Sequence, residues 1–458
     1  MADGKFNRMH YALGALLLLC IAAVAAVSTR AGGANGSVFP LVEVSVFDLP
    51  EETRQEFLIG QRNVCGDKAD PNVAAYPEFT SDKPLYGMAR FADPQDENAP
   101  GEVYYFALDE SGGTDAGYDR LHFDLNHDRD LTNDRVLTVQ KSPPSTAMLG
   151  YSDLKQQTCF ENLAIPFACG SDGARPVEMM PRLVISNSGY SSLSLVTTKA
   201  RKGRIKFAGQ KCDVLLGHCY VVSGWFDQPF TALHLSPPGN SRPWDWWGGD
   251  RLSAMHKVGG KFYTFSATPT GDKLIVRPYD GPLGTFEVGA GGRDIGRLEI
   301  RGSLRSKTTA VAVGEIASGT RPEPVRSCRL PVGDYLPEMV SLNYDTLSIN
   351  ISNNYHSDGK PRDTTHRRWV YGIAIREDKP FVLDFSNKPA VLFASPARDE
   401  RVKTGDEISV KAVLIDPVLD VMIRDLSTGG DRSTSLDPKV TIARSNGEIV
   451  AEGVMPFG

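Results

Sequence analysis

Short runs of apolar residues in an alternating pattern recur along most of this chain. The clearest case is Leu347, Ile349 and Ile351, which alternate with small polar residues. A period of two places the apolar side chains on one face of a half-buried strand. Runs rich in Val, Tyr and Phe between Gly, Pro and Asp residues are typical of strands as well. Together these patterns predict strands at 42–47, 102–108, 121–123, 204–207, 212–216, 262–266, 273–277, 285–288, 297–301, 347–351, 390–395, 407–415, 421–424, 439–444 and 448–454.

One segment favours a helix. Residues 51–59 begin with two glutamates and end before Gly60, which gives an acidic first turn and a glycine at the exit. Residues 142–182 show no clear period and are interpreted as a connection. Many short strands without helical crossovers predict a mainly β chain of several β-sandwich or open-barrel domains. We expect a signal or anchor helix at 1–31, a β domain at 35–141, a connecting region at 142–202, a β-rich central region at 203–388 and a β-sandwich at 389–458.

The first thirty residues have the layout of an export signal. Lys5 and Arg8 precede an uncharged stretch at 11–28, which ends in small residues such as Ala25 and Ala26. A basic start, an apolar middle and a small-residue exit are typical of a secretory signal peptide. The stretch is also close to the ~20 apolar residues that span a bilayer, so an uncleaved membrane anchor stays open. Both alternatives predict a periplasmic, cell-surface or extracellular protein that contacts the membrane only through this segment.

The composition is that of a folded and mildly acidic protein. A length of 458 residues exceeds one ordinary domain, and 44 Gly with 30 Pro favour many turns. The 50 Lys and Arg are spread among 56 Asp and Glu without a basic cluster, so we expect no nucleic-acid partner. No GxSxG, HExxH, P-loop or GxGxxG motif stands between a strand and a helix, so the sequence identifies no catalytic residue.

Six cysteines follow Cys20 in the sequence. They are Cys65, Cys159, Cys169, Cys212, Cys219 and Cys328. An even number outside the cytoplasm can form disulfides, and the spacing makes Cys159 with Cys169 and Cys212 with Cys219 the local pairs to test. The alternative is that these cysteines are small buried hydrophobic residues.

One loop carries specific chemistry. Directly after the strand at 121–123, oxygen-bearing side chains recur at alternate positions and again at the far end, namely Asp124, Asn126, Asp128, Asp130 and Asp134. Calcium takes about six to eight oxygen ligands, so a short loop with inward-facing carboxylate and amide oxygens can bind it. Leu131 is placed to anchor the loop on the core. The five polar residues are therefore candidate ligands of a structural calcium ion that orders the loop.

This pattern resembles the calcium loops of EF-hand, dockerin and thrombospondin type 3 modules at Asp124, Asn126, Asp128 and Leu131. It departs from them at Arg129, where those loops place a glycine, and at Asp134, which stands one position before their closing acid. The entry is a strand, so a strand-bounded calcium loop is the expected form. The alternative is a solvated turn, since Asp and Asn favour turns by themselves. Four carboxylates within eleven residues repel one another, which favours a cation.

A second candidate site is rich in tryptophan. Trp244, Trp246 and Trp247 lie in one turn-flanked segment beside acidic residues. Exposed indole rings next to carboxylates can hold sugar rings through apolar stacking and hydroxyl hydrogen bonds. The alternative interpretation is a tryptophan plug that covers the end of a β-sandwich.

The last 70 or so residues resemble the small immunoglobulin-like modules of exported bacterial proteins. The resemblance rests on Ser395-Pro396 after one strand, Gly405-Asp406 in the next turn, and Asp416-Pro417 after the following strand. The chain as a whole resembles exported bacterial proteins that join calcium-type acidic loops to β-sandwich modules. This implies a non-catalytic envelope or extracellular protein, a binding module or scaffold whose partner is a polysaccharide or another envelope protein. The competing hypothesis is a carbohydrate-active enzyme whose catalytic acids the sequence does not identify.

Overall fold

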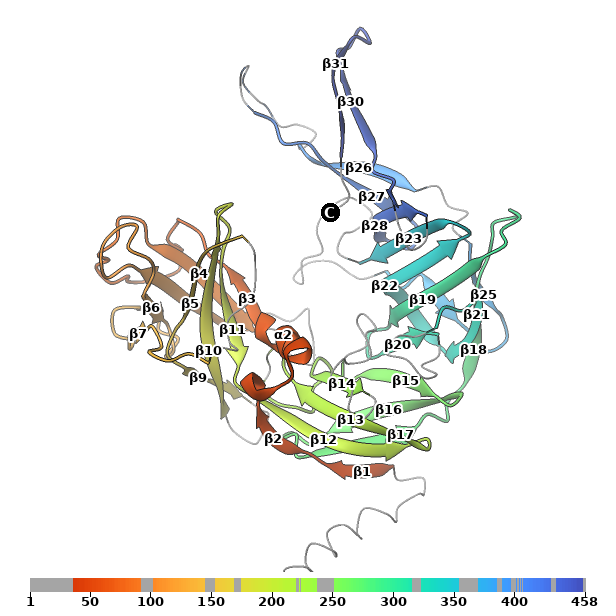
Figure 1. Cartoon of the computed structure of the whole chain (residues 1–458), viewed down its shortest axis with the longest axis horizontal. Helices are drawn as coiled ribbons and strands as arrows, with labels where there is room; N and C mark the ends of the chain where they lie inside the picture. Colours follow the sequence, from red (N-terminus) through yellow and green to blue (C-terminus); the bar gives the residue numbers. More distant parts are fainter. Residues whose placement is uncertain are drawn as a thin grey trace, which may run out of the picture.

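The mainly β fold that the alternating pattern predicted is confirmed, and the strands in the described residues form six β-sheets (Figure 1). The computed structural model describes residues 36–91, 102–144, 153–168, 174–219, 222, 224–236, 251–314, 323–353, 370–384, 389–396, 401, 403, 405, 407–429 and 434–455. Within these ranges one α-helix, α2 (Glu51–Ile59), and one short 3-10 helix, η2 (Val46–Asp48), accompany the strands. The protein is therefore mainly β.

The N-terminal sandwich is built from two sheets. The first orders its strands as β4 (Leu85–Phe91), β5 (Glu102–Asp109), β6 (Arg120–Phe123) and β7 (Leu137–Thr138). The second orders β3 (Gln61–Val64), β11 (Ser191–Thr197), β10 (Ala174–Ser186) and β8 (Leu154–Cys159), with β9 (Leu163–Ala168) also on β10. Phe106 and Phe123 of the first sheet share one buried core with Leu183 and Leu193 of the second. This core supports the acidic loop that follows β6.

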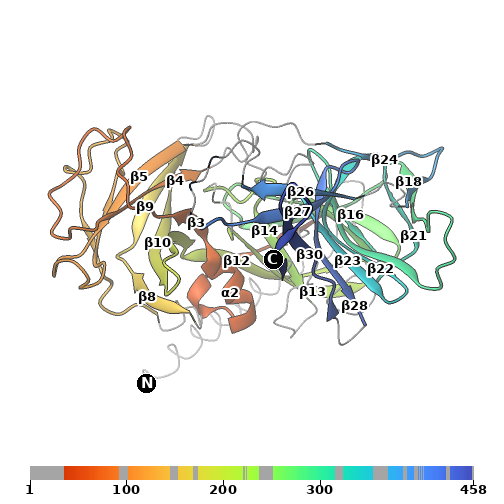
Figure 2. The same ribbon diagram turned by 90° about the horizontal axis from the view of Figure 1, so that it is seen from above.

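Two further cores occupy the middle of the chain. One core lies between two sets of four strands. The first set is β2 (Val42–Ser45), β12 (Lys199–Phe207), β13 (Gln210–Gly217) and β14 (Ala232–Ser236). The second set is β1 (Ser37–Pro40), β17 (Lys273–Pro278), β16 (Lys261–Ala267) and β15 (Ala254–Val258). The other lies between β20 (Ala310–Val313), β19 (Leu298–Arg305) and β22 (Gly333–Tyr344) and the sheet of β21 (Ser327–Pro331), β18 (Leu283–Val288) and β25 (Phe381–Leu383). Figure 2 shows the N-terminal sandwich and the β18–β22 region at opposite ends of the molecule.

A single thirteen-stranded sheet runs from the central region into the C-terminal segment. Its order is β1-β17-β16-β15-β20-β19-β22-β23-β28-β27-β26, with β24 on β22 and β29 on β28. The strands not yet placed are β23 (Leu347–Ser352), β24 (Ile373–Ile375), β26 (Ala390–Ser395), β27 (Lys411–Asp416), β28 (Val421–Thr428) and β29 (Thr434–Ser435). A separate hairpin, β30 (Lys439–Ala443) with β31 (Ile449–Val454), follows. Hydrogen-bonded strands therefore cross the predicted domain boundaries. β1 pairs with β17, β2 with β12, β3 with β11, and β28 with β23.

The interpretation of residues 142–202 as a connecting region is wrong. Four strands and the start of a fifth, β8 to β12, lie there, and β10 is the longest strand of its sheet. In β11 every residue is buried although three of the seven are serines, and Leu193 and Leu195 alternate with Ser192 and Ser194. Leu193 and Leu195 face the core of the N-terminal sandwich, so this short period of two was a strand signal that the sequence analysis did not use.

The predicted helix at 51–59 is confirmed. α2 begins after Pro50 and ends before Gly60, whose φ of 59° is left-handed. A Cβ at Gly60 would lie 2.5 Å from the Leu195 carbonyl oxygen, so the close approach to β11 also requires glycine here. Phe57 and Leu58 are fully buried and dock the helix on the sheets. No helix in the described residues is both long and apolar enough to cross a membrane, and the predicted signal or anchor segment at 1–31 lies outside them.

The cysteines that the structure describes lie mostly in cores. Cys212 is a buried free thiol of β13, so the predicted pair with Cys219 is not formed. Cys169, the predicted partner of Cys159, lies outside the described residues. Burial raises the pKa of the thiols of Cys65 and Cys212 to about 12 and about 11. These two side chains fit the alternative interpretation, that of small buried hydrophobic residues.

Candidate functional site

The acidic loop connects two paired strands of the N-terminal sandwich. β6 ends at Phe123, β7 begins at Leu137, and the two strands pair antiparallel, so residues 124–136 close a hairpin. The N–H of Asp124 donates to the Tyr105 carbonyl oxygen at 2.9 Å, which continues the β5–β6 contact by one residue. Leu131 is fully buried and anchors the loop on the sandwich. The loop is thus bounded by strands on both sides.

Three successive Asx turns shape the first half of the loop. Oδ1 of Asn126, Asp128 and Asp130 each accepts a hydrogen bond from the N–H two residues further on, at 3.0, 2.8 and 2.9 Å. Asn133 reaches across the loop, because its Nδ2 donates to Asp128 Oδ2 at 2.7 Å. The hydrogen bonds from Asn133 and from the Asp130 N–H favour the charged carboxylate and lower the pKa of Asp128. The turn chemistry of the alternative interpretation is therefore present in these three residues.

Two residues other than glycine make the tight bends. His127 and Arg129 have φ values of 62° and 64°, a left-handed conformation that costs a side-chain-bearing residue roughly 1–2 kcal/mol. At Arg129 the bend directs the backbone N–H to Asp124 Oδ2 at 3.2 Å. At His127 the ring packs edge-on against Tyr104, with 3.8 Å between ring centroids. Contacts made by the loop therefore impose the conformation that EF-hand-like loops obtain with glycine.

Two carboxylates, one from each end of the loop, carry buried oxygens without partners. Asp124 is only 1% exposed, and its Oδ1 has no hydrogen bond. Asp134 accepts the Leu125 N–H at 3.2 Å through Oδ1, but its Oδ2 is buried and likewise unbonded. Burial raises the pKa of both carboxyl groups, and the charges of neighbouring carboxylates raise them further. Buried carboxylate oxygens without donors destabilise the fold, so they are the atoms that a cation would stabilise most.

The five predicted ligands therefore fall into two groups. Asp124 and Asp134 hold unbonded oxygens in the interior of the loop, whereas Asn126, Asp128 and Asp130 use side-chain oxygens for turns. In the described ranges no three His, Cys, Asp or Glu side chains are arranged to hold a metal ion. A cation at this loop would therefore exchange some turn hydrogen bonds for oxygen ligands, with carbonyl groups and water completing the about six to eight that calcium needs.

A segment that the sequence did not assign to the site braces the loop. The N–H of Ala74 donates to the Arg129 carbonyl oxygen at 2.7 Å, and the Leu131 N–H donates to the Ala75 carbonyl oxygen at 3.0 Å. Tyr76, the next residue, packs edge-on against Tyr86 of β4 at 5.0 Å between centroids. No alternation or motif marks residues 74–76, and the loop residues that Ala74 and Ala75 contact lie more than fifty positions away in the chain, so no local signal was available.

The tryptophan segment lies outside the described residues. Trp244, Trp246 and Trp247 fall between 236, where one described range ends, and 251, where the next begins. Arg251, the first described residue after them, pairs with Glu338 at 3.1 Å and lies over the ring of Phe230 at 5.2 Å from its centroid. Arg251 is therefore packed against described residues just before β15. The sugar-binding and plug interpretations both remain expectations.

A thiol, an imidazole and a carboxylate meet beside α2. Cys219 Sγ lies 4.0 Å from His234 Nε2, and Glu56 Oε2 lies 3.4 Å from the same nitrogen. In a nucleophile–base–acid relay the acid contacts the ring nitrogen opposite the one that faces the nucleophile. Cys219 and His234 are buried, and the His234 ring packs against Phe57 at 5.3 Å between centroids. This geometry belongs to a packed polar contact and does not match a nucleophilic site.

The candidate site therefore rests on its own geometry. No protein-family model matches the chain, and no curated protein or solved structure shows significant similarity to it.

Proposed function

We propose that the chain is a non-catalytic, exported binding or scaffold protein whose N-terminal sandwich is stabilised by a calcium ion in the loop at 124–134. The observation that carries the calcium site is the pair of buried oxygens, Asp124 Oδ1 and Asp134 Oδ2, that have no hydrogen-bond partner. Native proteins rarely leave buried polar atoms unpaired, and a missing ion is one physical reason for such atoms.

The donor set favours calcium over other common metals. The buried side-chain atoms of the loop that lack a partner are both carboxylate oxygens, and the one imidazole, His127, packs against Tyr104. Zinc prefers nitrogen and sulfur ligands, and magnesium requires near-ideal octahedral geometry, whereas calcium accepts flexible sets of oxygen ligands. Burial, and after it the charges of the neighbouring carboxylates, raise the pKa of Asp134, and a bound ion would offset both effects.

The position of the loop supports a structural role for the ion. The loop closes the β6–β7 hairpin and is braced by the backbone of Ala74 and Ala75, so an ion that orders it would stiffen this end of the sandwich. A ligand that binds only the folded state stabilises it by about 2.7 kcal/mol at a hundredfold excess over Kd. A rigid sandwich end of this kind suits a scaffold or a module that presents a binding surface to a polysaccharide or an envelope protein.

Calcium titration by calorimetry, paired with thermal unfolding in calcium and in chelator, tests this proposal. The wild type should bind calcium and melt at a higher temperature in its presence, and Asp124→Asn should lose both effects. Asp115→Asn is the matched control, because Asp115 is an exposed acid of the same sandwich outside the loop, paired with Lys83 at 3.7 Å. A wild type whose melting is identical in calcium and chelator, with no heat of binding, contradicts the proposal.

The export part of the proposal rests on Lys5, Arg8 and the uncharged stretch at 11–28. Fusion of residues 1–35 to a reporter enzyme that is active only outside the cytoplasm tests it directly. Replacing two residues of the stretch, Leu17→Arg with Leu18→Arg, should abolish the reporter signal, because charges in the apolar segment oppose membrane insertion. A signal that survives this change means that the segment does not direct export.

A further inference from the structure

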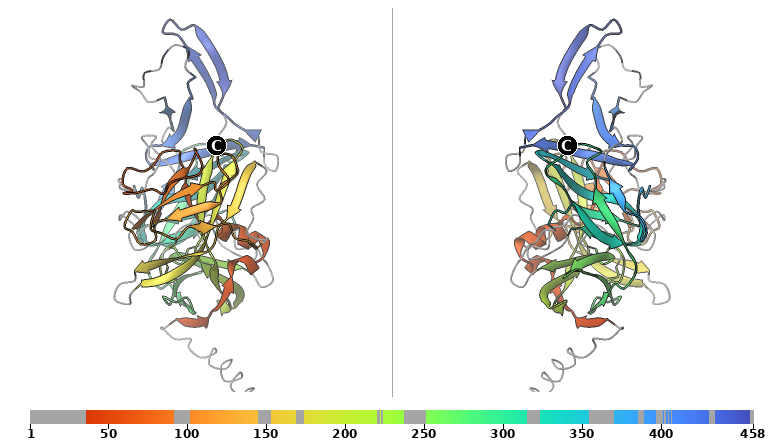
Figure 3. Two further views of the ribbon diagram at one scale, coloured as in Figure 1. Left: turned by 90° about the vertical axis from the view of Figure 1, so that its left-hand side faces the viewer. Right: turned by 90° about the vertical axis from the view of Figure 1, so that its right-hand side faces the viewer.

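An irregular segment crosses the outer surface of the N-terminal sandwich. Residues 67–80, here named the strap, run between β3 and β4 without forming a helix or a strand of either sheet. The structure describes all of these residues, and none of them is buried. The left view of Figure 3 looks onto this side of the molecule, with the orange elements of the sandwich in front. A segment with few buried contacts opens at a low cost in free energy, so its attachment depends on a small number of ties.

The strap covers the face of β4, β5 and β6 that points away from the core. Ala107 pairs with Tyr86 on one side and with His122 on the other, so these three side chains share that face. Although it lies outside the core, Ala107 is 0% exposed and His122 is 7% exposed. Phe79 of the strap packs edge-on against His122 and Tyr86, at 6.0 and 5.8 Å between centroids, and Tyr76 packs against Tyr86. Two aromatic side chains of the strap therefore act as the cover.

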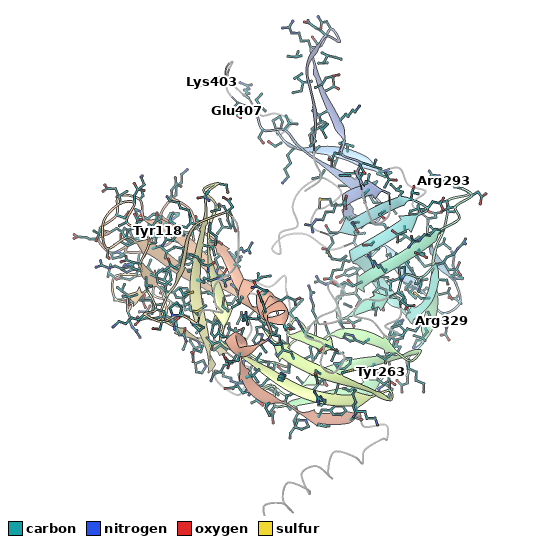
Figure 4. The ribbon with its side chains drawn as sticks, viewed as in Figure 1. Tyr118, Tyr263, Arg293, Arg329, Lys403 and Glu407 are labelled. Atoms are coloured by element: carbon teal, nitrogen blue, oxygen red, sulfur yellow. The ribbon has the colours of Figure 1, made fainter. Side chains whose placement is uncertain are left out.

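Both ends of the strap are tied to the sheet by contacts that do not involve the acidic loop. Just before the strap, Gly66 forms an isolated bridge to β4 with two backbone hydrogen bonds of 2.8 Å. Just after it, the Ser81 N–H donates to Asp109 Oδ1 at 2.9 Å. The Tyr118 hydroxyl, labelled in Figure 4, donates to the Lys83 carbonyl oxygen at 2.7 Å and adds a further tie at this end. The two ends can therefore stay in place when the middle of the strap moves.

The backbone in the middle of the strap is tied to the acidic loop. Ala75 forms a parallel bridge with Asp130, and the Leu131 N–H donates to the Ala75 carbonyl oxygen at 3.0 Å. The Ala74 N–H donates to the Arg129 carbonyl oxygen at 2.7 Å. These bonds require the left-handed bend at Arg129, whose φ is 64°. A calcium ion held by the carboxylates of the loop would fix this bend, so the same backbone that the strap needs is the backbone that the ion orders.

We propose that the strap is a calcium-dependent cover, an inference that rests on the calcium site of the proposed function. The ion in the loop at 124–134 holds the middle of the strap on the sheet. Release of the ion frees residues 70–79, while the ties at Gly66 and Ser81 remain, and uncovers the outer face of β4, β5 and β6. The coupling is reciprocal by linkage, because a strap that docks more firmly must also raise the affinity of the loop for calcium.

Hydrogen exchange of the full chain, in calcium and in chelator, tests the cover. Openings that release the ion are suppressed by the factor 1 + [Ca]/Kd, so peptides from 70–79 should exchange up to about a hundredfold more slowly at a hundredfold excess over Kd. Peptides from 110–119 are the control, because that connection of the same sheet has its own backbone hydrogen bonds, including Ala116 N–H to the Gly113 carbonyl oxygen at 3.0 Å. Calcium that binds with measurable heat but leaves exchange at 70–79 unchanged overturns this inference alone. The absence of any heat of binding overturns the calcium site as well.

Calcium affinity tests the reciprocal effect. Tyr76→Ala removes packing on Tyr86 but none of the candidate ligands, and it should weaken calcium binding several-fold in calorimetry. Tyr190→Ala is the matched control, because Tyr190 is 42% exposed between β10 and β11 of the other sheet, and it should bind calcium as the wild type does. His122, which Phe79 covers, should react faster with diethyl pyrocarbonate in chelator than in calcium. Wild-type affinity in Tyr76→Ala overturns the inference, as does a reaction rate of His122 that calcium does not change.

Discussion

Gly87 of β4 offers a sharp test of how the N-terminal core supports the acidic loop. Its Cα is in register with Phe106 of β5, and a Cβ there would lie 2.3 Å from Phe106 Cζ and 2.8 Å from Cε2. Phe106 is 1% exposed and stacks on Phe123, with ring planes 3° apart and centroids 6.3 Å apart. The ring therefore cannot move away from an alanine without displacing Phe123, the residue that precedes Asp124.

Gly87→Ala should therefore destabilise the protein. Overpacking a well-filled core costs about 1–3 kcal/mol, and each kcal/mol lowers Tm by roughly 3 °C for a unit of about 150 residues. Urea unfolding followed by circular dichroism measures the change in free energy. Gly66→Ala is the matched control, because Gly66 bridges to Tyr86 beside Gly87 but a Cβ there meets nothing within 4 Å. The control should change the free energy of unfolding by less than about 0.5 kcal/mol, or stabilise slightly.

A double-mutant cycle identifies the contact responsible. Phe106→Leu removes part of the ring that the new methyl group would strike, so the cost of Gly87→Ala should shrink in the Phe106→Leu background. Residues in direct contact show such coupling, whereas distant residues add independently. If Gly87→Ala loses no more stability than Gly66→Ala, or if the two changes are additive, the ring contact is not the cause and the reasoning is refuted.

Three further predictions concern the loop and the buried thiols. Arg129→Gly should stabilise the chelated protein by about 0.5–1 kcal/mol in urea unfolding, because it relieves a left-handed φ of 64°, whereas Arg129→Ala should not. The pKa of Asp124 is raised in the folded state, so its stabilising contribution is present at low pH and lost as the pH rises through the raised pKa. In chelator, the free energy of unfolding of Asp124→Asn should therefore increase relative to that of the wild type as the pH rises from roughly 3 to 7. A difference in free energy that stays constant across that range would contradict the raised pKa. The thiols of Cys65 and Cys212, with pKa values of about 12 and about 11, should resist a thiol reagent at pH 8 until urea unfolds the chain; modification of either thiol in the folded protein, read by mass spectrometry, would disprove their burial.

Local signals in the sequence were sufficient where the structure is local. The helix at α2 is marked by its own acidic first turn and by Gly60, and β23 by strict alternation at Leu347, Ile349 and Ile351. The order of acids between 124 and 134, and the hydrophobic anchor Leu131 among them, likewise stand in the sequence itself. Period-two patterns arise where one face of a strand meets the core and the other meets water.

Tertiary structure alone decided the rest. All seven residues of β11 are buried, its three serines included, and the pairing of β3 with β11 joins segments more than a hundred residues apart. Within the loop, the sequence presents five oxygen-bearing residues as equals, but among these five the fold leaves buried unbonded oxygens only on Asp124 and Asp134, and it braces the turn with Ala74. The physical reason is that burial and long-range backbone hydrogen bonds depend on which distant segments meet. Residue type and spacing determine which chemistry a segment can perform, and the packing around it determines which atoms are left to perform it.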